Sequence, residues 1–261
     1  MNRLCPLFLS HGAPSLALDD GPAHQFLRQL GRELPRPEAI LVISAHWSTA
    51  APAVTGGEAP ATIHDFYGFP DALYELRYPA PGEPALADEV RGRLAAAGFD
   101  CGVDEDRGLD HGAWVPLLLM YPQADIPVVQ LSLQTRLDPA HHHAVGRTLA
   151  GLSENGILVL GSGGVVHNLG RLGPPGSPAP PWATDFETWV TEHVEAGDAD
   201  ALLDYRTRAP AAATAHPTEE HLLPLFTALG AAGAGARGRP LHRSFDYASL
   251  AMSCYAFDAA G

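Results

Sequence analysis

The chain contains short continuous apolar runs, each of which ends at a polar or glycine-rich turn. Residues 39–43 (Ala-Ile-Leu-Val-Ile) form one such run, and His46 follows closely behind it. A run without polar alternation is typical of a strand whose two faces both meet the core, as in a parallel sheet. We therefore predict a buried strand here, and the same pattern predicts strands at 4–10, 126–133 and 156–161.

The segments between these runs carry apolar residues at helical spacing. Leu86, Val90 and Leu94 recur every four residues, which predicts a helix over 84–97 that Gly98 closes. The same reasoning predicts helices at 23–34, at 139–152, from Thr184 onward and from Thr218 to Leu229, a mostly irregular stretch at 48–84, and closing strands at 241–245 and 249–257. Strands that alternate with helices form parallel pairs joined by right-handed crossovers. We therefore expect a single α/β domain spanning 1–261, with a mostly parallel central sheet flanked by helices and a site at the carboxyl ends of the strands.

Composition and charge narrow the function classes. The formal net charge of −14 argues against binding to nucleic acid phosphates or to anionic membranes. No apolar run approaches the roughly 20 residues needed to span a bilayer, and residues 1–3 lead into a strand without a signal-peptide pattern. Three scattered cysteines, with no C-x-x-C pair, are typical of reduced thiols, so we expect a cytoplasmic protein.

The chain has 13 histidines, and their positions matter more than their number. His11, His46, His111 and His167 each lie in a turn flanked by glycine or an aromatic residue after an apolar run. Strand-end loops of an open α/β sheet gather in one crevice, so these rings are expected to meet. Neutral imidazole binds zinc and iron and also serves as an acid or base. The run 141–143, by contrast, points three adjacent helical residues in different directions, which indicates a solvated first turn.

Other reaction classes remain open at this point. A nucleophilic hydrolase would need a G-x-S-x-G elbow, and Leu160 replaces its first glycine before Ser162. The glycines of 161–164 could instead cradle a phosphate, although the dinucleotide pattern fails at Val166. A zinc hydrolase that uses the same histidines is the main competitor, and a non-catalytic metal-binding protein is the third alternative.

Six short motifs contain most of these histidines. They are Ser10-His11-Gly12-Ala13-Pro14, Ser44-Ala45-His46-Trp47, Ile63-His64-Asp65-Phe66, Leu109-Asp110-His111-Gly112, Val165-Val166-His167-Asn168 and Pro217-Thr218-Glu219-Glu220-His221. In their order and spacing these motifs resemble the class III extradiol ring-cleavage dioxygenases, and most of all their 4,5-DOPA dioxygenase-like branch. The resemblance covers nearly the whole chain.

The resemblance implies a role for each matching residue. His11 and His46 would be metal ligands, and His221 would hold the third position, where the wider class has a glutamate; Glu220 is the fallback ligand. His167 would be the catalytic base and could also complete a four-histidine shell around zinc. The other implied roles are a second acid/base for His111 and pocket walls for His64 and Phe66.

The implied chemistry is the opening of an aromatic ring. The cofactor expected for turnover is non-heme Fe(2+), and Zn(2+) is an alternative occupant because the all-histidine set lacks the carboxylate charge. The partners would be a small aromatic diol of the catechol type and O2. The product would be a ring-opened semialdehyde acid.

Overall fold

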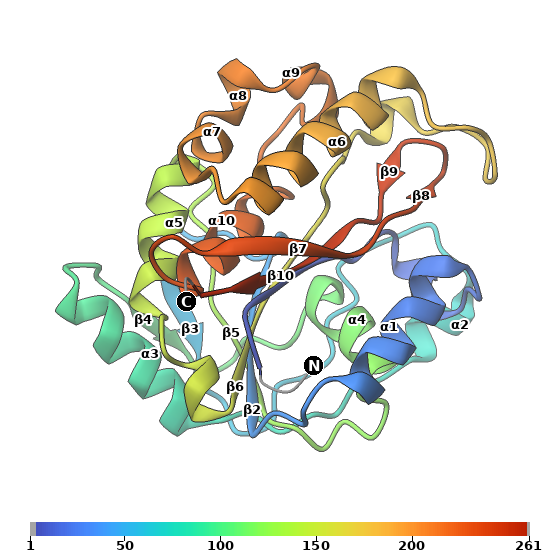
Figure 1. Ribbon diagram of the computed structural model, residues 1–261. Helices are drawn as coiled ribbons and strands as arrows, with labels where there is room; N and C mark the ends of the chain where they lie inside the picture. Colours follow the sequence, from blue (N-terminus) through green and yellow to red (C-terminus); the bar gives the residue numbers. More distant parts are fainter. Residues whose placement is uncertain (1–3, 260–261) are drawn as a thin grey trace.

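The computed structural model describes residues 4–259, so the segment 1–3, where no signal peptide is predicted, lies outside the described residues. A six-stranded sheet in the order β5-β2-β6-β1-β10-β7 forms the centre of the molecule (Figure 1). Its strands are β1 (Leu7–Ser10), β2 (Ala39–Ser44), β5 (Val128–Gln130), β6 (Ile157–Gly163), β7 (Arg237–His242) and β10 (Cys254–Asp258).

The prediction of a mostly parallel sheet is confirmed. The four strands β5, β2, β6 and β1 pair in parallel. The last two differ, because β10 is antiparallel to both β1 and β7. The α/β class therefore rests on four parallel strands whose carboxyl ends share one edge of the sheet.

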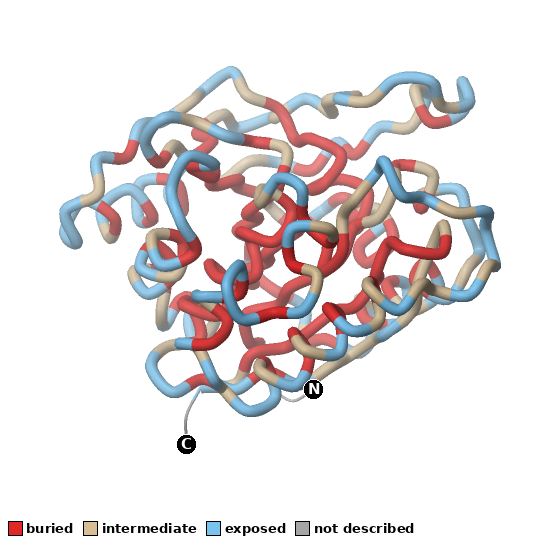
Figure 2. Tube along the Cα trace, turned by 90° about the horizontal axis from the view of Figure 1, so that it is seen from above, coloured by how far each residue is buried: buried red, intermediate tan, exposed pale blue. Residues whose placement is uncertain are grey.

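Alternate side chains of β1 and β2 enter two separate cores, as the pleat requires. Leu7, Leu9, Ile40 and Val42 enter the core covered by α1 (Pro22–Glu33) and α4 (His111–Met120). The residues between them enter the other core, which is covered by α3 (Pro84–Ala96), α5 (Pro139–Thr148), α6 (Pro181–Ala196) and α10 (Leu223–Ala231). Because both faces of β1 and β2 are buried, their side chains are apolar on both faces up to the serine that ends each strand. Figure 2 shows the buried residues gathered through the middle of the molecule.

Shorter elements complete the chain. They are η1 (Pro14–Ala17), β3 (Ala53–Thr55), α2 (Asp71–Glu75), β4 (Gly102–Asp104), η2 (Ser153–Asn155), η3 (Leu169–Arg171), α7 (Ala199–Leu203), α8 (Tyr205–Arg208), α9 (Ala212–Ala215), β8 (Phe245–Asp246) and β9 (Leu250–Ala251). Among helices of the described residues, none is long and apolar enough to cross a membrane.

The structure differs from the predicted elements in two places that bear on the site. The stretch 48–84 contains β3, which pairs in parallel with β4, and also the short helix α2. The helix predicted from Thr218 begins only at Leu223, with Pro224 in its first turn. Proline lacks an N–H and is tolerated where that group has no helical partner, so the preceding residues form turns instead.

Candidate metal centre

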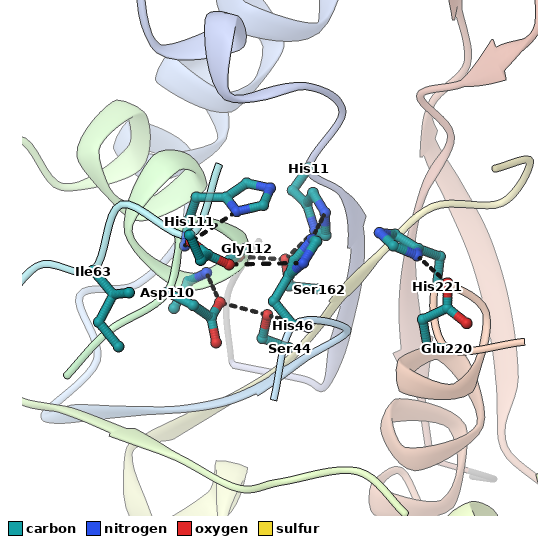
Figure 3. A network of polar contacts seen from close by, with 12 residues as sticks. His11, Ser44, His46, Ile63, Asp110, His111, Gly112, Ser162, Glu220 and His221 are labelled. Carbon is teal, nitrogen blue, oxygen red and sulfur yellow. Dashed lines mark hydrogen bonds and ion pairs between the residues drawn. The ribbon is translucent and has the colours of Figure 1, made fainter. Parts of the chain in front are cut away.

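Two histidines meet because their strands are neighbours of the same central strand. His11 directly follows β1 and His46 lies two residues after β2, and both strands pair with β6. Their Nε2 atoms are 3.0 Å apart although 35 residues separate them in the chain. The predicted convergence of strand-end imidazoles is therefore observed, as Figure 3 shows.

His221 reaches the same point from the segment before α10, and glycines in β6 make this approach possible. The N–H of Gly164 donates to the His221 carbonyl at 2.8 Å. A Cβ on Gly163 would lie 2.0 Å from that carbonyl oxygen, and one on Gly161 would lie 2.4 Å from the carbonyl oxygen of Pro224. The glycines at 161 and 163 thus lie in β6, and close backbone packing explains them without a phosphate. The His221 ring centroid lies 5.0 Å from that of His46.

The three rings together fit a metal ion. The potential ligand atoms of His11, His46 and His221 all lie within 4.8 Å of one another. His221 Nε2 is buried and has no hydrogen-bond partner, and an orphaned buried acceptor of this kind is costly unless something binds it. Two Nε2 atoms that face each other at 3.0 Å likewise need a shared proton or a cation between them.

Burial keeps these rings neutral, which is the form that binds metal. Desolvation lowers the pKa of His11 and of His221 well below the usual value, and the neighbouring histidines lower it further. Desolvation, reinforced by His111, lowers the pKa of His46 to about 4, against the opposing pull of the nearby carboxylates. An uncharged cluster of lone pairs therefore lies at the strand ends near neutral pH.

His167 lies against His221. Their rings are stacked with centroids 3.4 Å apart and planes 7° apart. The backbone N–H of His167 donates to the Ala215 carbonyl at 3.0 Å, and this bond anchors the turn after β6. Burial lowers the pKa of His167 to about 4, although Glu220 opposes this shift. His167, Glu220 and His221 also form a group that could hold an ion, so the structure is compatible with His167 either as a ligand or as a base.

His111 is the first residue of α4, and its ring centroid lies 3.9 Å from that of His46. The helix start is defined by Asp110, whose carboxylate accepts from the Ala113 N–H and from the Ser44 hydroxyl. An aspartate at this position satisfies a free N–H of the first turn. The ring is therefore held at the site by a helix N-terminus that is itself tied to β2.

Asp65 is a site residue that sequence reasoning did not single out. Its Oδ1 accepts the backbone N–H of His111 at 2.9 Å and lies 3.0 Å from the Nδ1 of the same residue. Burial alone would raise the pKa of Asp65, but the contacts with His111 outweigh it and lower the pKa to about 2. The only sequence signal was an acidic residue beside His64 in one of the quoted motifs, since its pairing with position 111 is non-local.

The two residues predicted as pocket walls differ in what their rings contact. The Phe66 ring meets the His111 ring edge-on, with centroids 5.7 Å apart, and so borders the site. The His64 ring lies beside Phe66 and Trp114, and its Nε2 is 3.1 Å from the Leu76 carbonyl oxygen. Among the described residues, His64 has ring contacts with Phe66, Tyr74 and Trp114, and Phe66 in turn contacts His111.

Comparisons with known proteins find a matching family model, related sequences and a related structure. Residues 6–258 match the family model described as the catalytic LigB subunit of aromatic ring-opening dioxygenase. The chain is 44% identical over 254 residues to a 4,5-DOPA dioxygenase extradiol of Beta vulgaris, with 96% of this chain and 95% of the relative covered. It is also 44% identical to the protein of the same name from Escherichia coli K12, with 88% and 85% covered. A crystal structure of the uncharacterized protein JW3007 from Escherichia coli K12 superposes with a TM-score of 0.79 at 36% identity, covering 95% of this chain and 97% of that one.

Proposed function

This chain belongs to the family of catalytic LigB subunits of aromatic ring-opening dioxygenases, and we propose from this premise that it is a metal-dependent extradiol dioxygenase. The proposed substrate is a DOPA-like catechol, which O2 would convert to a ring-opened semialdehyde acid. The observation that supports this best is the convergence of His11, His46 and His221, three imidazoles from distant parts of the chain. The names of the relatives support the DOPA-like substrate.

The proposed ligands are the three converging rings, with Glu220 as an outer partner of His221. Glu220 Oε1 lies 3.1 Å from the Nδ1 of His221, on the opposite side of the ring from the orphaned Nε2. His11, His46 and His221 would hold the ferrous ion, which would supply Lewis-acid and redox chemistry toward the catechol oxygens and O2. Zinc could bind the same rings but could not pass electrons to O2.

The proton-handling roles fall to the two remaining histidines. His167 is neutral because burial depresses its pKa, so it can accept the second phenol proton of a bound catechol. His111 Nδ1 lies 3.0 Å from the Asp65 carboxylate, which holds the ring at the edge of the site, so His111 is the residue placed to donate a proton to a developing oxygen anion. We therefore assign the role of base to His167 and the role of acid to His111.

The wall of the site suits a flat aromatic substrate. Phe66 packs among Phe69, Tyr74 and Trp114, and this aromatic cluster borders the His111 ring. Aromatic rings favour offset or edge contacts with another ring, so the wall would orient a catechol as it excludes water. The overall reaction adds both atoms of O2 to the carbons of the broken ring bond, so it needs no other oxidant or reductant.

The test is anaerobic loading with Fe(II), followed by air and a panel of catechols that includes DOPA. We expect one O2 consumed per catechol and a new absorbance from the ring-opened product, both lost in His46→Ala. Ester or amide turnover by the zinc-loaded protein, without O2 uptake, would contradict the proposal in favour of a hydrolase. Metal binding without any turnover would contradict it in favour of a binding protein.

A further inference from the structure

Ser162 lies at the centre of the site without being a ligand, a base or a pocket wall. It belongs to β6, where it is in register with Leu9 of β1 and Ser44 of β2, and it is fully buried. Its Oγ is 2.9 Å from the Nδ1 of His11 and donates to the carbonyl oxygen of Gly112. We propose that Ser162 is a positioning residue that fixes the tautomer of His11 and thereby strengthens metal binding. This inference rests on the metal centre of the proposed function.

The direction of these hydrogen bonds follows from counting protons. A serine hydroxyl has one hydrogen, and a carbonyl oxygen can only accept. The hydroxyl hydrogen is therefore used on Gly112, and the Oγ lone pair must accept from His11 Nδ1–H. The other nitrogen of His11, Nε2, then carries the lone pair and faces His46 Nε2 at the centre. A second partner that fixes the tautomer of a ligating histidine is a general way of raising its affinity for metal.

The Gly112 carbonyl is available because of a proline four residues later. In an α-helix the carbonyl of residue 112 would accept from the N–H of residue 116. Residue 116 is Pro116, which has no N–H, so α4 leaves this carbonyl without its usual partner. Ser162 supplies the missing donor. A proline inside a helix removes one backbone hydrogen bond, and here the Ser162 hydroxyl replaces that bond.

The hydrogen bond between Ser162 and the Gly112 carbonyl also requires glycine at position 112. A Cβ there would lie 2.4 Å from the Ser44 Oγ and 3.1 Å from Cδ2 of His46. The first turn of α4 can therefore approach β2 and β6 only without a side chain at this residue. Since His111 precedes Gly112, the chain of bonds from His11 through Ser162 ends on the turn that carries the second acid/base histidine (Figure 3).

The first test needs no variant of Ser162. In the metal-free protein with ¹⁵N-labelled histidine, two-bond ¹H–¹⁵N correlations report the tautomer of each ring, and His11→Gln assigns the His11 signals. We expect His11 to carry its proton on Nδ1. A proton on Nε2 in the wild-type protein would overturn the proposal, whatever happens to the stability of any variant.

The second test measures zinc affinity by competition with a chromophoric chelator. We expect Ser162→Ala to weaken zinc binding about 10- to 100-fold and to leave His11 in a mixture of tautomers, while Ser162→Thr restores both in part. Ser253→Ala is the matched control, because Ser253 is equally buried but its hydroxyl donates to Glu187.

The two tests also separate this inference from the proposed function. Zinc affinity in Ser162→Ala within about two-fold of wild type, or an unchanged His11 tautomer, would overturn the inference. Both readouts are made without catechol or O2. A protein that binds zinc as expected but opens no ring would therefore contradict the proposed function and leave the role of Ser162 supported.

Discussion

Two regions of the molecule are rich in histidine, and they differ in how their rings are used. One is the strand-end site, where His11, His46 and His221 converge from separate segments. The other is the run 141–143 on α5, where three histidines are adjacent in sequence. His142 donates from Nδ1 to the Asp138 carbonyl and accepts the Gln134 N–H on Nε2, so both of its nitrogens are satisfied. His221 instead has one nitrogen on Glu220 and the other without a partner.

The pKa does not separate the two regions. Desolvation lowers the pKa of His142 to about 4, the same value that burial gives His46 and His167. A lowered pKa shows only that a ring is buried and neutral. The difference lies in geometry, since the rings of the strand-end site share unsatisfied nitrogens whereas the ring nitrogens of His142 bond to their local backbone. The prediction that the run is a solvated turn was wrong for His142, which is buried.

The largest expected difference between the regions is in metal binding. His46→Ala removes a proposed ligand, so we expect metal affinity and ring cleavage to fall by more than the roughly 10- to 100-fold typical of losing an outer partner. His142→Ala should leave one metal per chain. Elemental analysis of both variants after loading checks this, and metal retained by His46→Ala would refute the assignment.

His142 should instead matter for stability. His142→Ala removes a buried ring that bonds Asp138 and Gln134, so we expect the free energy of unfolding to fall by about 1–3 kcal/mol. Urea unfolding of the metal-free proteins measures this change. A neutral effect would show that α5 does not depend on the ring.

Glu220 offers a finer test of the strand-end site. Glu220→Gln keeps an oxygen near His221 Nδ1 but removes the negative charge, so we expect metal affinity to fall about 10-fold. Glu219→Gln is the control, because the Glu219 carboxylate pairs with Arg206. A chelator competition that placed both variants at the same affinity would argue against a role for the Glu220 charge.

The pH dependence of stability should be shared by both regions. A histidine whose folded pKa is lowered to about 4 from the usual 6.5 binds fewer protons when folded, so its contribution is complete above pH 6.5 and is lost as the pH falls through about 4. His142→Ala should reduce the slope in this window by at most about 1.4 kcal/mol per pH unit. Unfolding of the metal-free protein at several pH values tests this, and an unchanged slope would contradict the assigned shift.

The sequence was sufficient to predict the sheet and the convergence of the histidines, for a physical reason. Continuous apolar runs mark buried parallel strands, and parallel strands bring their carboxyl ends to one edge. His11, His46 and His167 follow such runs, so their meeting could be predicted. The roles of these residues remain proposals, as does the single-domain boundary at 1–261.

Three other features of the fold and the site depend on strand register and side-chain packing, which no local sequence pattern encodes. The β3–β4 pair joins two three-residue strands across a long separation. Asp65 meets His111 only once the loop before α2 is folded. The sequence suggests a nucleophile or a phosphate cradle at Ser162 and not its link to Gly112, because that link depends on a missing N–H at Pro116 in another element.

The most direct test of the central claim is X-ray absorption on the metal-loaded protein, with wild type and His221→Ala measured together. With zinc, we predict one ion per chain and a first shell of at least three imidazole nitrogens at about 2.0–2.1 Å, one fewer in the variant. A shell dominated by oxygen, or one unchanged when His221 is removed, would contradict the convergence of these rings on a single ion.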